Sequence, residues 1–340
     1  MNADLKLLRA TTDDIFAAYQ DRPGLWEELE EAGLTRIGIP EEAGGSGGDA
    51  QQAAVVLRAA AYHAAGIPIA ETLWLAGPLL AAAGLPIPDG QLTAAEGDPA
   101  EVTLEPDGDG WRLDGTLKRV PWGRGAARIV VVVAGRVCVV DPAGSVFTEH
   151  SNLAGEPRDD VSFDSVALTA DQVAELPGGL SLRLRGALAR TVQLGGAAQR
   201  AMEHSLRYAS ERQQFGRPIA KFQAVQQYLA QIAGEVAILE LGARSAVAAL
   251  DDAEADSTMA IASARTNACR AAGVVTELAH QVHGAIGTTH EHDLRRFTMR
   301  LWSWREEYGN EALWASAVGL LAAAAEDPWH LITGTSPGRS

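Results

Sequence analysis

The sequence predicts an α+β protein with an N-terminal helical domain, a small central antiparallel β-domain and a C-terminal four-helix bundle. Three observations indicate this fold class. Apolar residues recur at helical spacing up to about residue 83, short β-rich runs separated by Gly, Pro and Asp follow, and long helical stripes begin at Ser181. We expect domains at residues 1–88, 89–178 and 179–328, followed by a flexible tail at residues 329–340. A chain of 340 residues is long enough to bury a sizeable core in two or three such modules.

The N-terminal part is expected to be helical, because Leu25, Leu29 and Ala32 share one helical face and Gly33 follows them as a stop signal. Residues 34–49 are rich in glycine, which raises the alternative of a phosphate-binding loop. No Lys-Ser/Thr pair follows and no strong strand precedes this segment, so we favour a long turn before a helix. A further apolar helix is expected at residues 70–83.

The central part carries two hairpin signals. Residues 102–104 and 111–113 flank a turn rich in Pro, Asp and Gly, and residues 129–133 and 137–140 flank a second short turn. Residues 161–166 alternate as a half-buried strand does. The strands follow one another without intervening helices, so we expect no Rossmann crossover.

The C-terminal part shows four apolar stripes at helical spacing, within residues 184–209, 222–239, 261–282 and 294–304. An antiparallel helical bundle buries such stripes against one another. Ala and Gly at facing positions allow the helices to approach closely.

The net charge of −16 argues against nucleic acid and anionic membranes as partners, because both require a basic surface. Cys138 and Cys269 lie far apart in apolar surroundings and are interpreted as reduced core residues without metal-type spacing. The N-terminal residues lack the apolar centre of a signal peptide, and no apolar run reaches the length of a membrane span. We therefore expect a cytoplasmic globular protein.

The turn within residues 208–226 concentrates unusual chemistry between two helical patterns. Arg212 supplies a planar cation suited to phosphate, Phe215 offers a flat apolar ring, and Gln223 offers donors and acceptors. Gly216 permits an unusual backbone angle. The structural alternative is a helix connection in which Arg212 pairs with Glu211 or another carboxylate, and for Arg212 alone we favour it.

A second cluster, residues 281–293, joins two further helices and has small residues where backbone N–H groups can approach a ligand. Its ionisable residues are His283, His290, Glu291, His292 and Asp293. Adjacent positions rarely converge on one metal ion, so we expect no metal site and favour helix capping and hydrogen bonding for Glu291 and Asp293.

These segments resemble known signatures. Glu-Arg-Gln-Gln-Phe-Gly-Arg-Pro at residues 211–218, continuing to residue 226, and Gln-Val-His-Gly-Ala-Ile-Gly at 281–287 look like the two C-terminal signatures of the acyl-CoA dehydrogenase family. Residues 34–49 resemble a third, N-terminal signature, and residues 160–166 are similar to the strand that closes the family's β-domain. Together they follow the family's order and span most of the chain.

The resemblance implies FAD as cofactor, an acyl-CoA substrate oxidised between Cα and Cβ, an electron-transfer acceptor and assembly into dimers or dimers of dimers. It further implies that Arg212 and Phe215, with Gln214 and Gln223 nearby, contact the adenosine diphosphate half of FAD across a subunit interface. Gln281 and the backbone of Gly284 and Ala285 are expected to meet the same half of the cofactor.

The catalytic half departs from the family pattern. The reaction needs a carboxylate base, but an ungapped match places Tyr308 at its position, and Glu307 serves only with a shift of one residue. The family's alternative base position falls at residues 185–187, where no acid exists, and Glu203 is interpreted as a surface carboxylate. The expected flavin-contacting segments of the β-domain are also missing or replaced, with Trp122 as either a flavin neighbour or a core residue.

The short chain and the Glu-His-Asp-Leu sequence at 291–294 resemble the smaller subunits of heterotetrameric actinobacterial acyl-CoA dehydrogenases, which act on bulky substrates such as steroid side-chain CoA thioesters. The leading hypothesis is a subunit that completes FAD sites with a homologous partner carrying the base. The alternatives are a self-sufficient homo-oligomeric enzyme that uses Glu307, and a scaffold subunit that binds no flavin.

Overall fold

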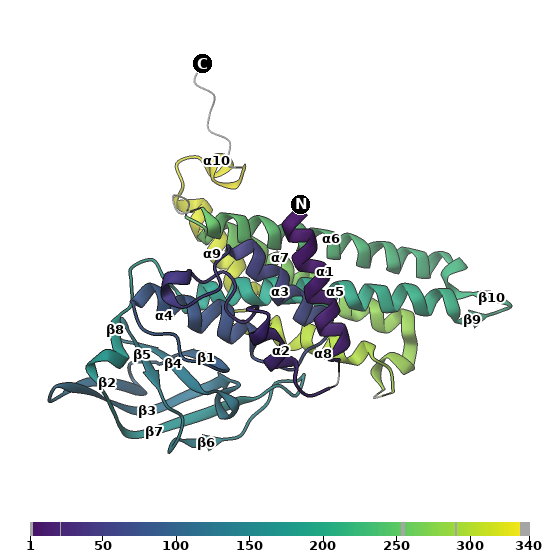
Figure 1. Ribbon diagram of the computed structural model, residues 1–340. Coiled ribbons are helices and arrows are strands. Elements are labelled where there is room, and N and C mark those ends of the chain that lie inside the picture. Colours follow the sequence, from purple (N-terminus) through teal and green to yellow (C-terminus); the bar gives the residue numbers. More distant parts are fainter. Residues whose placement is uncertain (1–2, 21, 253–255, 290, 334–340) are drawn as a thin grey trace. The chain divides into compact units, whose positions relative to one another are not determined.

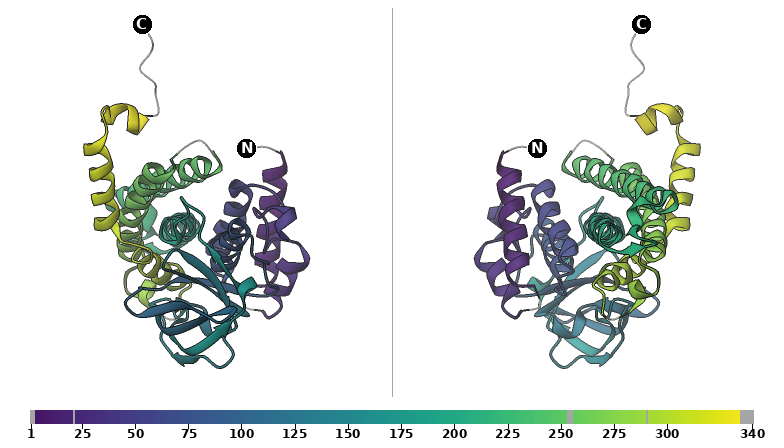
Figure 2. Two further views of the ribbon diagram at one scale, coloured as in Figure 1. Left: turned by 90° about the vertical axis from the view of Figure 1, so that its left-hand side faces the viewer. Right: turned by 90° about the vertical axis from the view of Figure 1, so that its right-hand side faces the viewer.

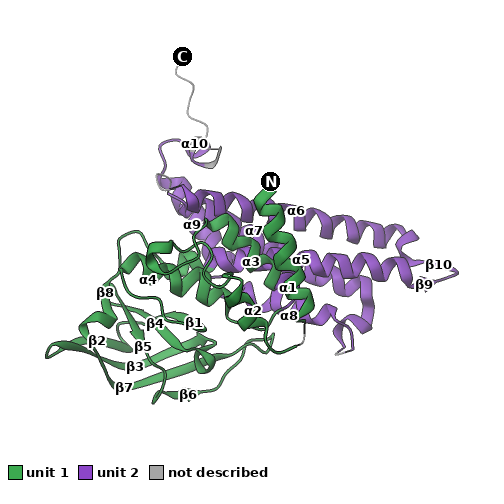
Figure 3. Ribbon diagram, in the orientation of Figure 1, with its two compact units in different colours: residues 1–60, 65–186 green, residues 61–64, 187–340 purple. Residues whose placement is uncertain are grey.

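The computed structural model describes residues 3–20, 22–252, 256–289 and 291–333 (Figure 1). The chain forms two compact units (Figure 3). Unit 1 comprises Met1–Ala60 and Ala65–Gly186, and unit 2 comprises Ala61–Ala64 and Ala187–Ser340. The N-terminal helices and the β-domain thus fall into one unit, and the division into three domains remains a prediction.

Unit 1 begins with helices, as the apolar spacing predicts. Their bounds are α1 Ala3–Ala18, α2 Leu25–Glu31, α3 Ala50–Tyr62, whose last two residues belong to unit 2, the π-helix η2 Ala70–Ala76 and α4 Gly77–Ala83. The glycine-rich segment 34–49 is a long turn that contains only a 3₁₀ turn, η1 Glu41–Ala43, and a bridge between Ile39 and Gly47. This agrees with the expected connector.

The helix predicted at 70–83 starts as a π-helix, whose seven residues are all buried. A wider helical turn leaves backbone groups to be satisfied from outside. The carbonyl of Trp74 accepts a hydrogen bond from Nε of Arg185 at 3.1 Å, and the Thr72 hydroxyl exchanges two hydrogen bonds with the backbone of Leu92. The π-helix is thereby attached to the first strand of the β-domain.

The β-domain contains two four-stranded sheets. One has the order β1 Leu92–Glu96, β4 Arg128–Val133, β5 Arg136–Val140 and β8 Val173–Glu175; the other has β2 Val102–Asp107, β3 Gly110–Pro121, β7 Arg158–Leu168 and β6 Val146–Thr148. Short 3₁₀ turns, η3 Gly123–Gly125 and η4 Ala170–Gln172, lie between strands. Both sheets contribute to one apolar core.

Both predicted hairpins are present, with Leu104 opposite Leu113 and Val131 opposite Cys138. One pair differs from the antiparallel expectation, because β1 runs parallel to β4. The two strands are separated by the whole β2–β3 hairpin, so a parallel pairing requires no tight turn between them.

Unit 2 is the helical bundle. Its long helices are α5 Leu182–Glu211, which starts at the end of unit 1, α6 Gln223–Asp251 and α7 Thr258–His283; the shorter ones are α8 Leu294–Trp304, α9 Glu311–Ala324 and α10 Pro328–Thr333. Helices α6 and α7 lie side by side, and α9 lies against α7 (Figures 1 and 2). The predicted stripes meet in a core that includes Ala198, Ile232, Val275 and Leu301.

Two details at the C-terminal end differ from the expectation. Helix α9 follows α8 as a separate element, which the predicted stripes do not include. Helix α10 occupies the start of the predicted flexible tail, because the carboxylate of Asp327 accepts a hydrogen bond from the N–H of Trp329 and Pro328 opens the first turn. Residues 334–340 lie outside the described residues. No helix in the described part of the chain has the length and apolar character that crossing a membrane requires.

Candidate cofactor-binding site

The connection between α5 and α6 is a miniature hairpin made of β9 Gln213–Gln214, β10 Arg217–Pro218 and the 3₁₀ turn η5 Ile219–Lys221. Gln214 pairs with Arg217, which leaves Phe215 and Gly216 as a two-residue turn with φ angles of 50° and 77°. Two successive positive φ angles are the signature of a type I′ turn.

Phe215 is an unusual residue for such a turn. A side chain other than glycine in left-handed backbone costs about 1 kcal/mol, and the Phe215 side chain is 92% exposed, so burial within the chain does not offset this cost. The edge of its ring meets Phe222 at a centroid distance of 6.1 Å. A strained backbone that presents an uncovered aromatic ring suits contact with a ligand or another chain.

Arg212 lies at the base of this hairpin with a fixed backbone and an exposed side chain. Its N–H donates to the carbonyl of Tyr208, and its carbonyl accepts from the N–H of Ile219, both at 2.8 Å. Within residues 3–20, 22–252, 256–289 and 291–333, its guanidinium has no hydrogen-bond or ion-pair partner, so the pairing with Glu211 that we favoured for Arg212 alone is not formed. Gln214 and Gln223 are exposed as well.

The second turn begins where α7 ends at His283. Gly284 has φ 64° and ψ −150°, a combination that only glycine adopts without strain, and the 3₁₀ turn η6 Gly284–Thr288 follows. Gln281, Gly284 and Ala285 are all exposed. The predicted cofactor residues of this turn are therefore accessible to a ligand.

The capping role predicted for Glu291 and Asp293 is wrong. Asp293 occupies the N-cap position of α8, but its side chain makes no capping hydrogen bond, and the exposed Glu291 makes none among the described residues. Nδ1 of His292 instead accepts a hydrogen bond from the N–H of Leu294 at 3.0 Å. His290 lies outside the described residues, and within them no group of three or more His, Cys, Asp or Glu could hold a metal ion.

The two turns share one end of the bundle. The ring of Tyr208, one helical turn before Arg212, stacks on the ring of His283, with centroids 4.5 Å apart and planes at 24°. Gly284 directly follows His283. The structure therefore joins two segments that lie about seventy residues apart in the sequence.

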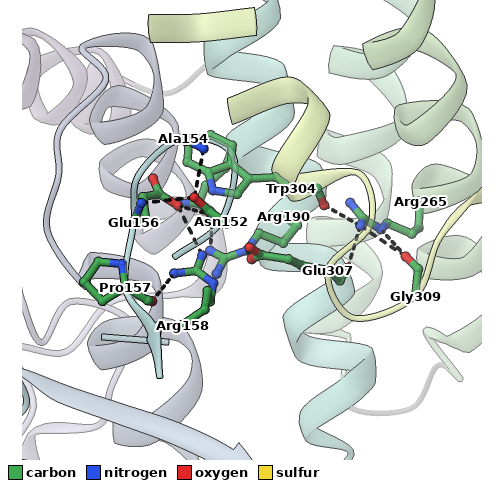
Figure 4. Close-up of polar contacts among 11 residues, drawn as sticks. Asn152, Ala154, Glu156, Pro157, Arg158, Arg190, Arg265, Trp304, Glu307 and Gly309 are labelled. Carbon is green, nitrogen blue, oxygen red and sulfur yellow. Dashed lines mark hydrogen bonds and ion pairs between the residues drawn. The ribbon is translucent and has the colours of Figure 1, made fainter. Parts of the chain in front are cut away.

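Glu307, the candidate base, is held in an ion pair within unit 2. Its Oε2 atom accepts a hydrogen bond from Nε of Arg190 at 2.7 Å, and the exposed fractions of the two side chains are 15% and 2% (Figure 4). Gln193 accepts a second hydrogen bond from the same guanidinium. The ring of Tyr308 lies 5.6 Å from the guanidinium carbon. A charge buried this deeply depends on its partner.

Arg265 holds the turn that carries Glu307. Its guanidinium donates to the carbonyls of Trp304, Glu307 and Gly309, and it is completely buried (Figure 4). Burial lowers the pKa of Arg265. Positive φ angles at Tyr308 and Gly309 complete this tight turn. The position of the Glu307 backbone is thus fixed by three carbonyl contacts of one side chain.

Glu203 is not the simple surface carboxylate that the sequence suggested. It accepts hydrogen bonds from the hydroxyl of Tyr62 and from Gln199 and Arg200. Burial acts to raise the pKa of Glu203, but these hydrogen bonds outweigh it and lower the pKa. In unit 1, Trp122 is half-buried in left-handed backbone, so it is neither a core residue nor fully exposed.

Two segments of the chain match known protein domains. Residues 8–85 match the N-terminal domain of acyl-CoA dehydrogenases, and residues 184–313 match the C-terminal domain. The chain belongs to the acyl-CoA dehydrogenase family. Members of this family are flavoprotein oxidoreductases that act on the CH–CH group of acyl-CoA and generally use FAD.

Several curated acyl-CoA dehydrogenases are similar along most of their length. The chain is 29% identical to acyl-CoA dehydrogenase IpdE2 of Mycolicibacterium smegmatis, covering 82% of this chain and 81% of that protein. It is 27% identical to acyl-CoA dehydrogenase FadE28 of Mycobacterium tuberculosis, covering 84% and 88%.

Solved acyl-CoA dehydrogenase structures share the fold. The Tcur3481-Tcur3483 steroid ACAD G363A variant gives a TM-score of 0.83 at 28% identity, covering 94% of this chain and 98% of that one. The ChsE4-ChsE5 complex from Mycobacterium tuberculosis gives 0.81 at 22% identity, covering 96% and 98%.

Proposed function

We propose that this chain is one subunit of an FAD-dependent acyl-CoA dehydrogenase that introduces a double bond between Cα and Cβ of a bulky, steroid-derived CoA thioester. In this proposal it contributes the adenosine-side contacts to FAD, a homologous partner subunit carries the catalytic base, and an electron-transfer acceptor reoxidises the enzyme. Two observations carry the proposal together: the buried ion pair between Arg190 and Glu307, and the exposure of the candidate cofactor residues elsewhere in the bundle.

The residues of the two turns fit the adenosine diphosphate half of FAD by their chemistry. Arg212 presents a planar cation without a partner among the described residues, which suits a diphosphate. The exposed ring of Phe215 suits contact with a heterocycle. Gly284 carries no side chain, so backbone N–H groups at its turn can approach the cofactor. The amides of Gln214, Gln223 and Gln281 can bond the ribose or adenine.

FAD, when bound, supplies the acceptor for the hydride that leaves Cβ. The protein must supply a carboxylate that removes the proton from Cα. Oε2 of Glu307 is held by the guanidinium of Arg190, which is 2% exposed. A neighbouring cation makes a carboxylate a weaker base, and moving Glu307 away would leave the guanidinium without its countercharge. We therefore assign proton removal to the partner subunit and a structural ion pair to Glu307.

The names of similar structures support a two-chain enzyme and the substrate class. One is described as a steroid acyl-CoA dehydrogenase made of two proteins, and another as a complex of two proteins. The second candidate function is a self-sufficient enzyme that uses Glu307. Its support is the position of Glu307 in the turn between α8 and α9, next to the expected base position.

The test is the flavin content of this chain co-purified with a homologous partner, measured by visible absorbance per complex. We expect Arg212→Ala to lose most of the bound flavin. Arg244→Ala, which removes an exposed arginine of α6, is the matched control and should retain it. Full flavin retention by Arg212→Ala would contradict the proposed contact between Arg212 and FAD, and it would favour the scaffold subunit that binds no flavin.

A further inference from the structure

The two cofactor turns rest on a cluster of five rings within unit 2. This ring cluster consists of His204, Tyr208, His283, His292 and Phe297. The residues come from α5, the end of α7, the loop after η6 and α8. Arg212 lies one helical turn after Tyr208, and Gly284 directly follows His283. The contact between these two rings therefore connects the two turns.

Its contacts form a continuous chain. His283 stacks on Tyr208, and His292 meets the edge of His283 with centroids 4.7 Å apart. His204 lies 5.9 Å from His292 and 5.5 Å from Phe297. His204 and His283 are buried, with exposed fractions of 9% and 4%. A stack of this kind is stable when its imidazoles are neutral, because burying a charge requires a compensating partner.

The hydrogen bonds define which ring nitrogens carry protons. Nδ1 of His283 lies 2.8 Å from the carbonyl of Ala279, which only accepts, so this nitrogen is the protonated one. Nδ1 of His292 accepts from the N–H of Leu294, so this nitrogen bears no proton. The start of α8 is therefore held by an unprotonated imidazole nitrogen.

Burial is the main cause that lowers the pKa of both His204 and His283, in each case to about 4. Three groups around His204 oppose a further positive charge, Arg200 and Arg207 of α5 and His292 of the loop, whereas Asp293 of the loop favours it.

The surroundings of His283 are similar. His280 of α7 and His292 of the loop oppose its protonation, whereas the backbone carbonyls of Ala279 and His204 favour it less strongly than burial opposes it. Both buried imidazoles are consequently neutral at neutral pH.

We propose that the ring cluster is a pH-sensitive joint that holds the two cofactor turns together while its imidazoles are neutral and separates them when the imidazoles are protonated. Tyr208 and His283 are then positioning residues for FAD, since they act through the turns that follow them. The effect on FAD rests on the proposed function, but the joint itself does not.

The sign of the pH dependence follows from the direction of the shifts. Each imidazole has an ordinary pKa of 6.5 and a lower one in the folded chain, so the unfolded chain binds more protons between pH 6.5 and about pH 4. The folded-to-unfolded ratio therefore falls on acidification through this window. The fall is up to about tenfold per pH unit for each imidazole.

The experiment is denaturant unfolding of the full chain across this pH window, with His283→Asn as the variant. Asparagine keeps a donor for the Ala279 carbonyl but does not titrate. We expect the variant to lose a large part of the pH dependence. The control is His150→Asn in the β-domain, whose native side chain is 51% exposed, and it should retain the wild-type profile. An unchanged profile in His283→Asn would overturn the proposal.

Two further measurements keep the test decisive. If the variant does not fold, NMR titration of the imidazole signals in the wild-type chain replaces it, and ordinary titration of both His204 and His283 near 6.5 would overturn the proposal. In the partner complex, flavin retention should fall in the same window and fall less in His283→Asn. A complex without flavin would contradict the proposed function. The pH dependence of unfolding would still test whether the ring cluster acts as a pH-sensitive joint.

Discussion

Nε of Arg190 lies 2.7 Å from Oε2 of Glu307, and this contact ties α5 to the turn between α8 and α9. The two residues are 117 positions apart in the sequence. The pair engages the acid that the sequence suggested as a candidate base, and it supplies the countercharge that a buried guanidinium requires in the bundle. The proposed division of labour between two subunits rests on this relationship.

Replacing Glu307 by Ala should destabilise the chain strongly, because the buried guanidinium of Arg190 would lose its countercharge. We expect a loss of about 3 kcal/mol in the free energy of unfolding, measured by denaturant titration. The neighbouring Glu306→Ala is the control. Its carboxylate is 55% exposed and pairs with Arg305, so its loss should be under about 1 kcal/mol. Equal effects of the two substitutions would show that the pair with Arg190 has no structural role.

Arg265→Lys tests the anchoring of the turn that carries Glu307. A lysine cannot reproduce a planar fork that serves three carbonyls, so buried acceptors would be left unsatisfied. We expect a loss of about 2–3 kcal/mol in unfolding free energy. The control is Arg270→Lys, on the same helix as Arg265. Arg270 forms a partly exposed ion pair with Glu235 of α6, so this substitution should change the unfolding free energy by less than about 1 kcal/mol. A mild effect at Arg265 would refute the anchoring role.

Phe215→Asn should separate stability from cofactor binding. Asparagine tolerates left-handed backbone better than phenylalanine, so the hairpin should gain about 0.5–1 kcal/mol in unfolding free energy. Flavin retention in the partner complex should fall, because the exposed ring is lost. Leu206→Asn, at a partly exposed apolar residue of α5, controls for the loss of surface apolarity. The idea fails if flavin retention in Phe215→Asn equals that of the wild type.

Gly284→Ala tests whether backbone conformation governs the second turn. No atom of the described residues lies within 4 Å of the added methyl group, so we attribute the expected cost to the φ of 64° with ψ of −150°. We expect about 1–3 kcal/mol of destabilisation by thermal unfolding. Gly234→Ala, at an equally open site within α6, should instead stabilise the chain by about 0.5–1 kcal/mol. Similar effects at the two glycines would contradict this assignment.

Periodic features of the fold could be predicted from the sequence. The stripes of the bundle and both hairpins combine hydrophobic spacing with clear turn residues, and these are local signals. The parallel pairing of β1 with β4 was missed, because it joins strands separated by the β2–β3 hairpin. The π-helical start at Ala70 was missed as well, since an apolar run such as 70–83 has the same spacing in either helix type.

The candidate site was predictable only in its local part. Arg212, Phe215 and Gly284 lie on turns whose residue types are visible in the sequence. Arg190 was not identified, because it lies within an apolar stripe and its role depends on a partner far along the chain. The stacking of Tyr208 on His283 likewise depends on how the ends of α5 and α7 meet. In the sequence, the available sign of a role for Arg190 is a charged residue among the apolar residues of a predicted helix.

The requirement for a partner subunit that carries the base can be tested by dye-linked dehydrogenation of a steroid-derived CoA thioester. Turnover is measured for this chain alone and for its complex with a homologous partner. We expect no turnover by the chain alone, turnover by the flavin-containing complex, and comparable turnover per flavin when Glu307 of this chain is replaced by Gln. A yellow, fully active homo-oligomer of this chain that loses its activity in Glu307→Gln would contradict the account.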